Sequence, residues 1–244
     1  MNKRHTFLFS YSFLLLSLSI AAQDKNLDKK PESTEKIVDT LPPGEKYGLR
    51  VGVDLSRIIR SYSSDNYEGL EFVADYRVYR KFYVSAEVGH ESLVRDEENI
   101  NVEGSGSYGR IGIDYNSYNN WYGMQNLIFV GLRYGLSTFN QRLNSYRIFT
   151  GSSIFPNREI ISGIQNDNLS ANWISFVVGL KVETLKNLYL GANVSLRRLL
   201  NQKQPNGFDN LFIPGFGQTN DFSSYNVGYS YTISYLISLK KRKR

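Results

Sequence analysis

The sequence predicts an all-β protein that forms an eight-stranded antiparallel up-and-down transmembrane β-barrel. Apolar residues recur at every second position in eight segments that begin at Tyr47, which is the period of a strand with two different faces. The connections between these segments are alternately short and long, as in barrels that cross a membrane. The polar faces carry equal numbers of acidic and basic residues, which would neutralise one another inside a closed barrel.

The start of the chain has the layout of a secretory signal peptide. Residues 1–4 are positively charged, residues 7–20 are mostly apolar, and Ala21, Ala22 and Gln23 offer a small-residue cleavage region. An uncleaved anchor is the alternative, but the apolar run is short for a membrane-spanning helix. Because the chain contains no cysteine, lipoprotein processing and disulfide bonds are excluded. We expect an exported protein with a signal peptide at 1–23.

The two ends of the expected mature chain are polar. Residues 24–46 are rich in Lys, Glu and Asp and contain prolines, so they predict a disordered periplasmic arm. Residues 240–244 are all basic and predict a periplasmic tail behind a barrel at 47–239. The net charge of +6 therefore comes from the signal peptide and this tail. This distribution argues against nucleic-acid binding, for which basic residues would lie on one folded surface.

The eight segments and their connections predict the topology. The segments are 47–55, 70–78, 82–89, 108–115, 128–136, 174–183, 188–197 and 226–237. The connections 79–81, 116–125 and 185–187 are short, whereas 57–69, 92–105, 139–172 and 200–224 are long. Tilted membrane strands need about 9–11 residues, and single-chain barrels have an even number of them. Outer-membrane barrels have short periplasmic turns, so we expect both termini on the periplasmic side of a Gram-negative outer membrane.

Alternation alone also fits a soluble barrel, in which the apolar face would fill the interior. The export signal, the charges of the polar face and the aromatic residues at both ends of the apolar face favour lipid instead. Aromatic belts of this kind lie at the two membrane–water interfaces. The predicted belt consists of Tyr47, Tyr76, Phe82, Tyr115, Trp121 and Tyr235 near the turns and of Trp173, Tyr225 and Tyr229 near the loops.

The polar face predicts a charge network inside the barrel, the lumen. An eight-stranded barrel is only wide enough for side chains to fill it, so charges in its plugged interior must pair. Glycines on the same face leave room for long arginine side chains. The predicted cations are Arg50, Arg77, Arg110, Arg133, Lys181 and Arg197, and the predicted anions are Asp54, Glu71, Asp75, Glu87, Asp114 and Glu183.

With these features the chain resembles the small eight-stranded outer-membrane barrels, the class of OmpX and the OmpA membrane domain. More narrowly, YGLRVGVDL at 47–55, FVADYR at 72–77 and FYVSAEVG at 82–89 resemble a family of outer-membrane barrels from Bacteroidota. The resemblance covers about 47–239 and implies an architecture without a particular activity. Barrels of this class usually end on an aromatic residue that the insertion machinery reads, whereas here Leu239 ends the last strand and a basic tail follows.

Residues that carry chemistry are scarce. His90 lies at the loop end of its strand, where it is too close in sequence to Ser92 for a triad on an extended chain. By strand parity His90 points to lipid or the rim, and Glu91 points inward. The stretches 96–98 and 166–168 lack the ligand spacing of a metal site, and we find no phosphate-binding glycine motif. We expect no enzyme, no metal and no cofactor.

The long loops are the remaining candidates for function. Two of them are more apolar than solvated loops need to be, and they would either cover the barrel mouth as a lid or bind a partner. The candidate contacts are Phe149, Phe155, Phe208, Phe212 and Phe216. The expected role is a structural or interaction component of the cell envelope, in contact with outer-membrane lipid, lipopolysaccharide and, as a candidate partner, another envelope protein. A narrow, porin-like pore for small solutes and a lipid-modifying enzyme are the alternatives.

Overall fold

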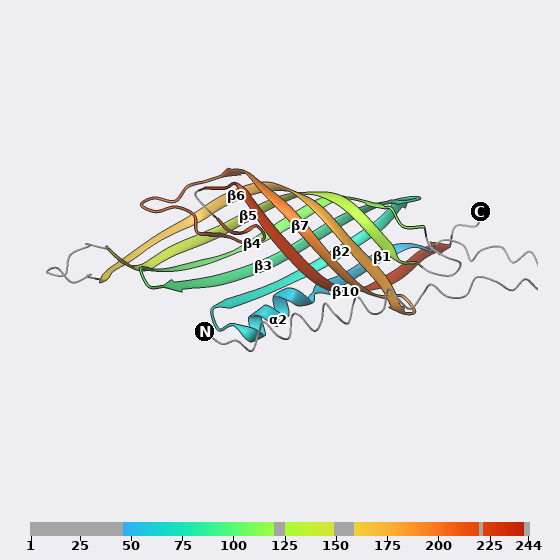
Figure 1. Ribbon diagram of the computed structural model, residues 1–244, viewed down its shortest axis with the longest axis horizontal. Coiled ribbons are helices and arrows are strands. Elements are labelled where there is room, and N and C mark those ends of the chain that lie inside the picture. The colour runs from blue at the N-terminus through green and yellow to red at the C-terminus, as the bar shows by residue number, and fades with distance from the viewer. Residues whose placement is uncertain (1–45, 120–124, 149–158, 220–221, 242–244) are drawn as a thin grey trace, which may run out of the picture. The chain divides into compact units, whose positions relative to one another are not determined.

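Eight strands close into an antiparallel ring in the computed structural model, which describes residues 46–119, 125–148, 159–219 and 222–241. Consecutive strands of the ring are neighbours, and the ring closes because β1 pairs with both β2 and β10 (Figure 1). The predicted eight-stranded antiparallel up-and-down barrel is confirmed. Its strands are β1 (Lys46–Asp54), β2 (Tyr67–Tyr79), β3 (Phe82–Glu97), β4 (Ile100–Asn116), β5 (Leu127–Arg147), β6 (Glu159–Leu185), β7 (Leu188–Gln202) and β10 (Tyr225–Lys241).

Several strands are longer than predicted at the end of the barrel remote from the termini. β3 and β4 continue to a tight turn between Glu97 and Ile100, so the expectation of a loop at 92–105 is wrong. β5 and β6 extend to Arg147 and Glu159 and occupy most of the segment 139–172, which was also expected as a loop. Continuous strand pairing, which the weaker alternation of these polar stretches concealed, replaces the first loop and the described part of the second.

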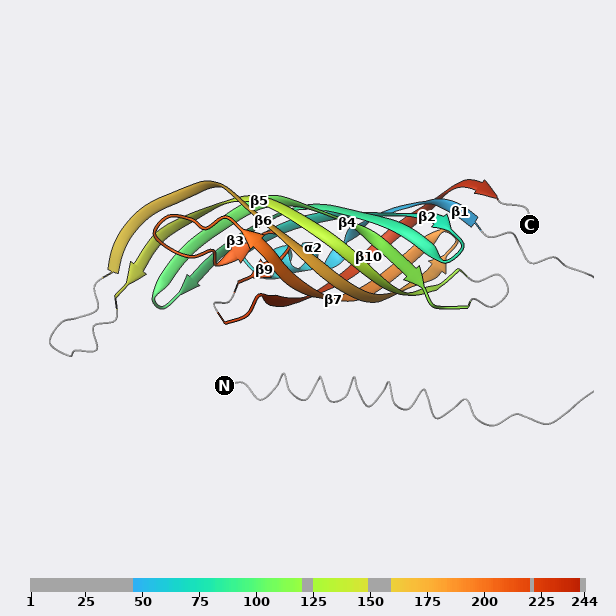
Figure 2. The ribbon, with the colours of Figure 1, turned by 90° about the horizontal axis from the view of Figure 1, so that it is seen from above.

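The longer strands outreach their neighbours. β2 pairs with β3 only as far as Tyr67, and β7 pairs with β6 only as far as Gln202. The ends of β3, β4, β5 and β6 therefore continue beyond the closed wall as a four-stranded sheet (Figures 1 and 2). We call this part the projecting sheet; it comprises residues 94–97, 100–103, 142–147 and 159–165.

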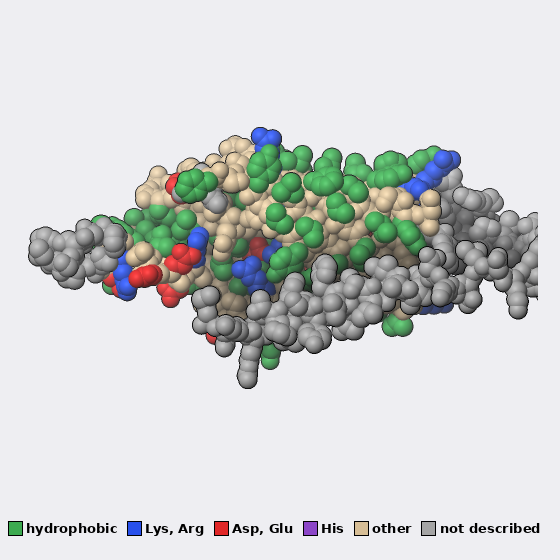
Figure 3. All heavy atoms as spheres, in the orientation of Figure 1, with side chains coloured by type: hydrophobic (Ala, Val, Ile, Leu, Met, Phe, Trp, Pro, Cys, Tyr) green, Lys and Arg blue, Asp and Glu red, His purple; other side chains and the backbone are tan. Residues whose placement is uncertain are grey.

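The wall follows from the period-two pattern, because successive side chains point to opposite sides of a strand. Ile111, Ile113 and Leu132 face outward and are more than half exposed, whereas Arg110 and Arg133 on the same strands are buried. Figure 3 shows hydrophobic side chains spread over the outside of the barrel. The apolar face of the sheet is therefore the outer one, and the ionic face is enclosed.

The connection after β1 contains a helix where the sequence analysis expected a loop. α2 (Leu55–Ser63) begins after Asp54, whose carboxylate accepts hydrogen bonds from the N–H of Ser56 at 2.8 Å and from its hydroxyl at 2.7 Å. An aspartate in this position satisfies a free N–H of the first helical turn. Ile58 faces away from the barrel and Arg57 faces into it. No helix in the described ranges is long and apolar enough to cross a membrane.

The connection between β7 and β10 folds back into the barrel mouth. It contains two short paired strands, β8 (Phe212–Ile213) and β9 (Gly217–Gln218), and a turn in which Gly215 has a φ of +79°. We call residues 212–218 the plug. Ile213 and Phe216 are buried, so this segment covers the mouth as a lid, one of the two roles left open for it.

The ends of the barrel differ slightly from the expected bounds. β10 continues to Lys241, and Lys240 pairs with Tyr47, so two residues of the expected basic tail belong to the last strand. The predicted signal peptide at 1–23 and the arm at 24–46, apart from Lys46, lie outside the described residues.

Candidate functional site in the barrel interior

The inward side chains share a narrow space, and glycines make room for the larger ones. A Cβ added to Gly131 would lie 2.0 Å from Oδ1 of Asp114 and 2.9 Å from Nη1 of Arg133. A residue without a side chain is therefore required beside this ion pair.

Asp75 binds two cations near the end of the barrel that carries the termini. Its Oδ1 accepts a hydrogen bond from Nε of Arg50 at 2.6 Å, and its Oδ2 accepts one from Nζ of Lys181 at 2.5 Å. The guanidinium of Arg50 also lies 4.9 Å and 5.1 Å from the ring centroids of Tyr83 and Tyr189. Aromatic faces attract a cation that has lost its water, so ion pairing and aromatic packing together fill this end.

Glu87 lies between two arginines in the middle of the interior. Nε of Arg110 is 2.7 Å from one of its carboxylate oxygens, and Nε of Arg133 is 3.4 Å from the other. Arg133 also donates two hydrogen bonds to Asp114, at 2.6 Å and 2.8 Å, and Asp114 accepts another from the Ser85 hydroxyl at 2.6 Å. These contacts connect β3, β4 and β5 from the inside.

Two further carboxylates lie toward the barrel mouth. Glu71 accepts hydrogen bonds from Arg110 at 2.7 Å and from the hydroxyl of Tyr108. Arg57 of α2 pairs with Glu91, and its Nε lies 3.7 Å from a carboxylate oxygen of Glu71. β1 ends at Asp54, so the helix that follows it supplies the inward cation closer to the mouth.

Glu91 connects the wall to the plug. Its Oε2 accepts a hydrogen bond from the backbone N–H of Gly215 at 2.7 Å, and its Oε1 accepts one from the Tyr67 hydroxyl at 2.6 Å. Gln141 holds the residues before the plug, because its amide donates to the carbonyl of Asp209 at 2.9 Å and accepts from the N–H of Leu211 at 3.2 Å.

An apolar cluster surrounds the plug, so the expectation of a polar interior is correct for the middle of the barrel and wrong for its mouth. The rings of Trp173 and Phe216 pack edge to face with centroids 5.9 Å apart. The cluster consists of Tyr108, Phe139, Leu169, Ala171, Trp173, Ile213 and Phe216. Burial of these side chains stabilises the plug in the mouth.

Two members of the predicted charge network lie at the turns near the termini, where the Arg77 guanidinium is 5.8 Å from the ring centroid of Tyr83, the ring that Arg50 also contacts. Arg77 is half-buried and donates from Nε to the carbonyl of Arg80 at 2.5 Å. Glu183 is half-buried and accepts a hydrogen bond from the N–H of Asn187 at 2.9 Å. These two side chains bind the adjoining turns.

Arg197 is inside the barrel, but its surroundings differ from those of the other cations. It is 4% exposed, donates from Nη1 to the carbonyl of Phe216 at 2.9 Å, and donates from Nε to the hydroxyl of Ser195 at 3.1 Å. In the part of the chain that the structure describes, no carboxylate forms an ion pair with it.

Most of the predicted aromatic belt faces outward. Trp173 was assigned to it wrongly: it is fully buried, because it shares the inward parity of Ser175 on β6. The side chains of Tyr47 and Trp121 lie outside the described part of the structure. The members that face outward are Tyr76, Phe82, Tyr115, Tyr225, Tyr229 and Tyr235.

The candidate loop contacts divide into three groups. Phe212 and Phe216 are buried in the mouth, and Phe208 is half-buried before the plug. Phe149 and Phe155 lie outside the described residues.

His90 is exposed on the outside of β3, on the face that strand parity indicated. Its Nδ1 lies 3.0 Å from the hydroxyl of Ser107 and its Nε2 lies 3.4 Å from that of Ser105, both on β4. Among the described residues, no group of three or more His, Asp or Glu side chains is arranged to hold a metal ion.

Three functional side chains were absent from the predicted network. Parity indicated that Glu91 points inward, which the structure bears out, but Glu91 was not assigned to the network. Tyr67 continues the inward parity of β2 beyond the predicted strand end, so a longer strand assignment would have found it. Arg57 carried no such signal, because it reaches the interior from a helix.

A closed eight-stranded barrel with an apolar outer face and a filled ionic interior is the class of protein that this fold and site define. A model of the family described as a domain of unknown function, DUF6048, matches residues 5–242, and the chain belongs to this family. No curated protein matches the chain in sequence.

One solved structure to which the chain is similar is Ail, the attachment invasion locus protein of Yersinia pestis. The sequences are 8% identical, the TM-score is 0.37, and the match covers 79% of this chain and 97% of Ail. A likeness this distant carries no functional argument. The narrower resemblance to barrels of Bacteroidota stays a prediction.

Proposed function

We propose that this chain is an integral outer-membrane barrel that conducts no solutes and acts as an interaction component of the cell envelope through its projecting sheet. The observation that carries the role is an open strand edge. The segment after β7 follows β6 as far as Asn166, through the Lys203 N–H on the Ser170 carbonyl at 2.8 Å and the Asn206 N–H on the Asn166 side chain at 2.9 Å. Beyond Asn166, no strand within the described ranges pairs with residues 159–165 on the side of β6 that faces away from β5.

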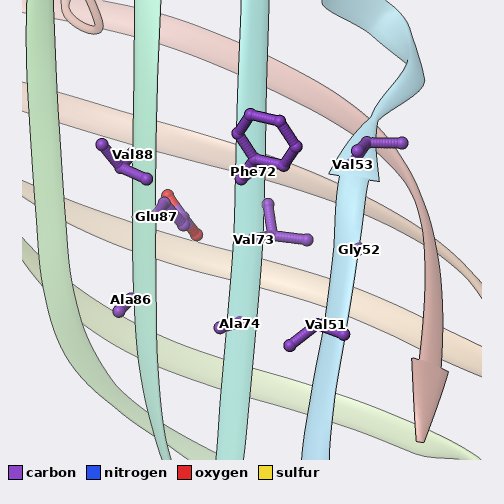
Figure 4. Close-up of a pocket in the computed structure, with 9 residues that line it drawn as sticks. All are labelled: Val51, Gly52, Val53, Phe72, Val73, Ala74, Ala86, Glu87 and Val88. Atoms are coloured by element: carbon purple, nitrogen blue, oxygen red, sulfur yellow. The ribbon is translucent and has the colours of Figure 1, made fainter.

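The apolar wall supports the membrane location. Its outward side chains are of the size and kind that acyl chains solvate, and water would not. Ala74 and Ala86 lie beside the larger side chains of Val51, Phe72 and Val88, and together they line a shallow apolar depression that lipid tails would fill (Figure 4). The extended strand ends and the long connection from β7 to β10 lie at the end of the barrel remote from the termini, which favours an orientation with both termini in the periplasm.

The filled interior supports a barrel that does not conduct. Arg110, Arg133 and Glu87 cross its middle, and the plug occupies its mouth. Opening a path would break ion pairs in a space from which water is largely excluded, which is costly.

The projecting sheet is suited to strand addition. An open edge presents backbone N–H and C=O groups that a partner strand can pair with. Ile161 is 87% exposed there, and Ile164 is also exposed. Gly163 and Asn168 have positive φ and lie at the two register shifts between β5 and β6, which are the positions of bulges that bend a strand.

Site-specific crosslinking in intact cells tests the role. A photoreactive residue in place of Ile161 should give a covalent adduct of defined mass, whereas the same residue in place of Tyr79, at the other end of the barrel, should not. Ile164→Lys should weaken the adduct, because charge on an edge strand opposes strand addition. The proposal fails if Ile161 gives no adduct or if Tyr79 gives the same one.

A lipid-modifying enzyme is the second candidate, and the His90–Ser107 distance of 3.0 Å favours it. A histidine can activate a serine hydroxyl at such a distance. It ranks second because His90 and Ser107 are directly opposite on neighbouring strands, where such contacts are common. Hydrolysis of an ester-linked lipid that is abolished by Ser107→Ala would favour the enzyme.

A further inference from the structure

Near the mouth, at the end remote from the termini, the barrel wall contains a gap between β2 and β10. β1 ends at Asp54, opposite Thr232 of β10, and its last residue paired with β2 is Val53, opposite Phe72. Within the described part of the chain, residues 67–71 of β2 and 225–231 of β10 therefore have no strand partner on the sides that face each other.

α2 covers this gap, and its polar groups replace strand pairing. Asp54 accepts a hydrogen bond from the N–H of Tyr231 at 3.2 Å. On the other side, the Ser61 hydroxyl accepts a hydrogen bond from the N–H of Gly69 at 2.8 Å, while its own proton points to the carbonyl of Arg57 at 2.9 Å. The helix thus closes the ring with side chains and leaves space beside it.

That space is a cavity of about 320 Å³ between α2, β10 and the plug. Its charged lining is entirely basic: Arg57 and Arg60 come from α2, and Arg197 comes from β7. Figure 3 shows basic side chains at the surface in this region of the wall. Arg57 is neutralised by Glu91, but neither Arg60 nor Arg197 pairs with a carboxylate among the described residues.

The position of the Arg197 guanidinium in the cavity depends on a glycine at position 228. A Cβ on Gly228 would lie 2.1 Å from its Nη2, so the guanidinium lies directly against the backbone of β10. Glu91 and Glu71 act on Arg197 electrostatically, but neither forms an ion pair with it. Burial of a cation without a directly paired anion is costly, and a ligand anion would lower that cost.

We propose that this cavity binds the phosphate group of a lipid headgroup, which enters sideways between β10 and α2. Guanidinium groups bind phosphate through paired hydrogen bonds, and Arg197 and Arg60 offer two of them. A lipid fits better than a free anion because Val227 and Tyr229 of β10, which line the cavity, also expose large apolar or aromatic side chains on the outside of the wall that suit the attached chains. The inference rests on the membrane location proposed above.

Native mass spectrometry of the full chain in detergent tests the site. The probes are diphosphorylated lipid A, the same lipid without its phosphates, and inorganic phosphate. We expect one phosphorylated lipid to be retained, and Arg197→Gln and Arg60→Gln each to reduce its retention by about fivefold or more, since a factor of ten corresponds to one good charged hydrogen bond. Gly228→Ala should also reduce retention, because it displaces the guanidinium without changing the net charge.

Arg142→Gln is the matched control, because Arg142 is exposed on the projecting sheet. Equal retention of both lipids, displacement by inorganic phosphate at equal concentration, or equal loss in Arg142→Gln would each overturn the proposal. Because Arg60 is exposed, Arg60→Gln should fold even where a buried substitution fails. A chain that folds as a monomer in buffer without detergent would refute the membrane location itself. A chain that folds only in detergent or lipid but retains both forms of lipid A equally would refute the phosphate site alone.

Discussion

The Glu91 carboxylate and the Gly215 backbone N–H are 2.7 Å apart, and they join residues of the wall and the plug that are 124 positions apart in the chain. The same carboxylate pairs with Arg57 and accepts from Tyr67. One side chain therefore connects α2, β2, β3 and the plug.

Glu91→Gln should loosen the plug, because the amide group replaces an acceptor among donors with a donor. The free energy of unfolding should fall by about 1–3 kcal/mol, the usual cost of unsatisfied buried groups. The unmodified chain should give almost no conductance in planar bilayers, and the conductance should rise in this variant. Glu103→Gln, at an exposed site on β4, is the control and should change neither quantity.

Arg133 and Arg197 should respond in opposite ways to neutralisation. Arg133→Met leaves the buried Asp114 without a cation, while Glu87 keeps Arg110, and should lower the free energy of unfolding by about 3–5 kcal/mol. Arg197→Met removes a cation without a carboxylate partner and should change it by no more than about 1 kcal/mol in lipid without phosphate monoesters. Urea unfolding in vesicles measures both; equal losses would show that Arg197 has a charged partner.

Glycine at position 131 should be required and glycine at position 109 should not. Gly131→Ala places a Cβ 2.0 Å from Asp114 Oδ1 and should cost about 1–3 kcal/mol. At Gly109 the nearest atom to an added Cβ is the Glu87 carbonyl oxygen at 3.9 Å, so Gly109→Ala should stay within about 0.5 kcal/mol of the unmodified chain. Unfolding experiments measure both variants. A similar loss of unfolding free energy in both would mean that β-strand propensity, and not the space available for a side chain, determines the effect of the substitution.

Leu132→Arg tests which face meets lipid. A charged residue on the lipid face near the bilayer midplane should destabilise the folded barrel by about 2–4 kcal/mol. Gln165→Arg, on the projecting sheet, should change stability by about 0.5 kcal/mol or less. Unfolding in vesicles compares them, and a harmless Leu132→Arg would contradict the proposed location.

The alternation of the strands could be predicted because it depends on one local rule, that side chains of a strand point alternately to two sides. Asp75, Asp114, Glu87, Arg110 and Arg133 were placed inside on this rule, and the structure buries each of them or holds it in the interior ion pairs. Their individual partners could not be predicted, because those depend on the stagger between strands.

The sequence by itself determined the ring of eight strands, its apolar outside and the charges it encloses, because the period of two is written into each segment. Tertiary structure alone decided that β1 stops at Asp54, that Arg57 enters from a helix, and that Phe216 packs on Trp173 in the mouth. The physical reason is that these features pair polar and charged groups, or bury apolar ones, that belong to distant parts of the chain. No local sequence pattern contains that information.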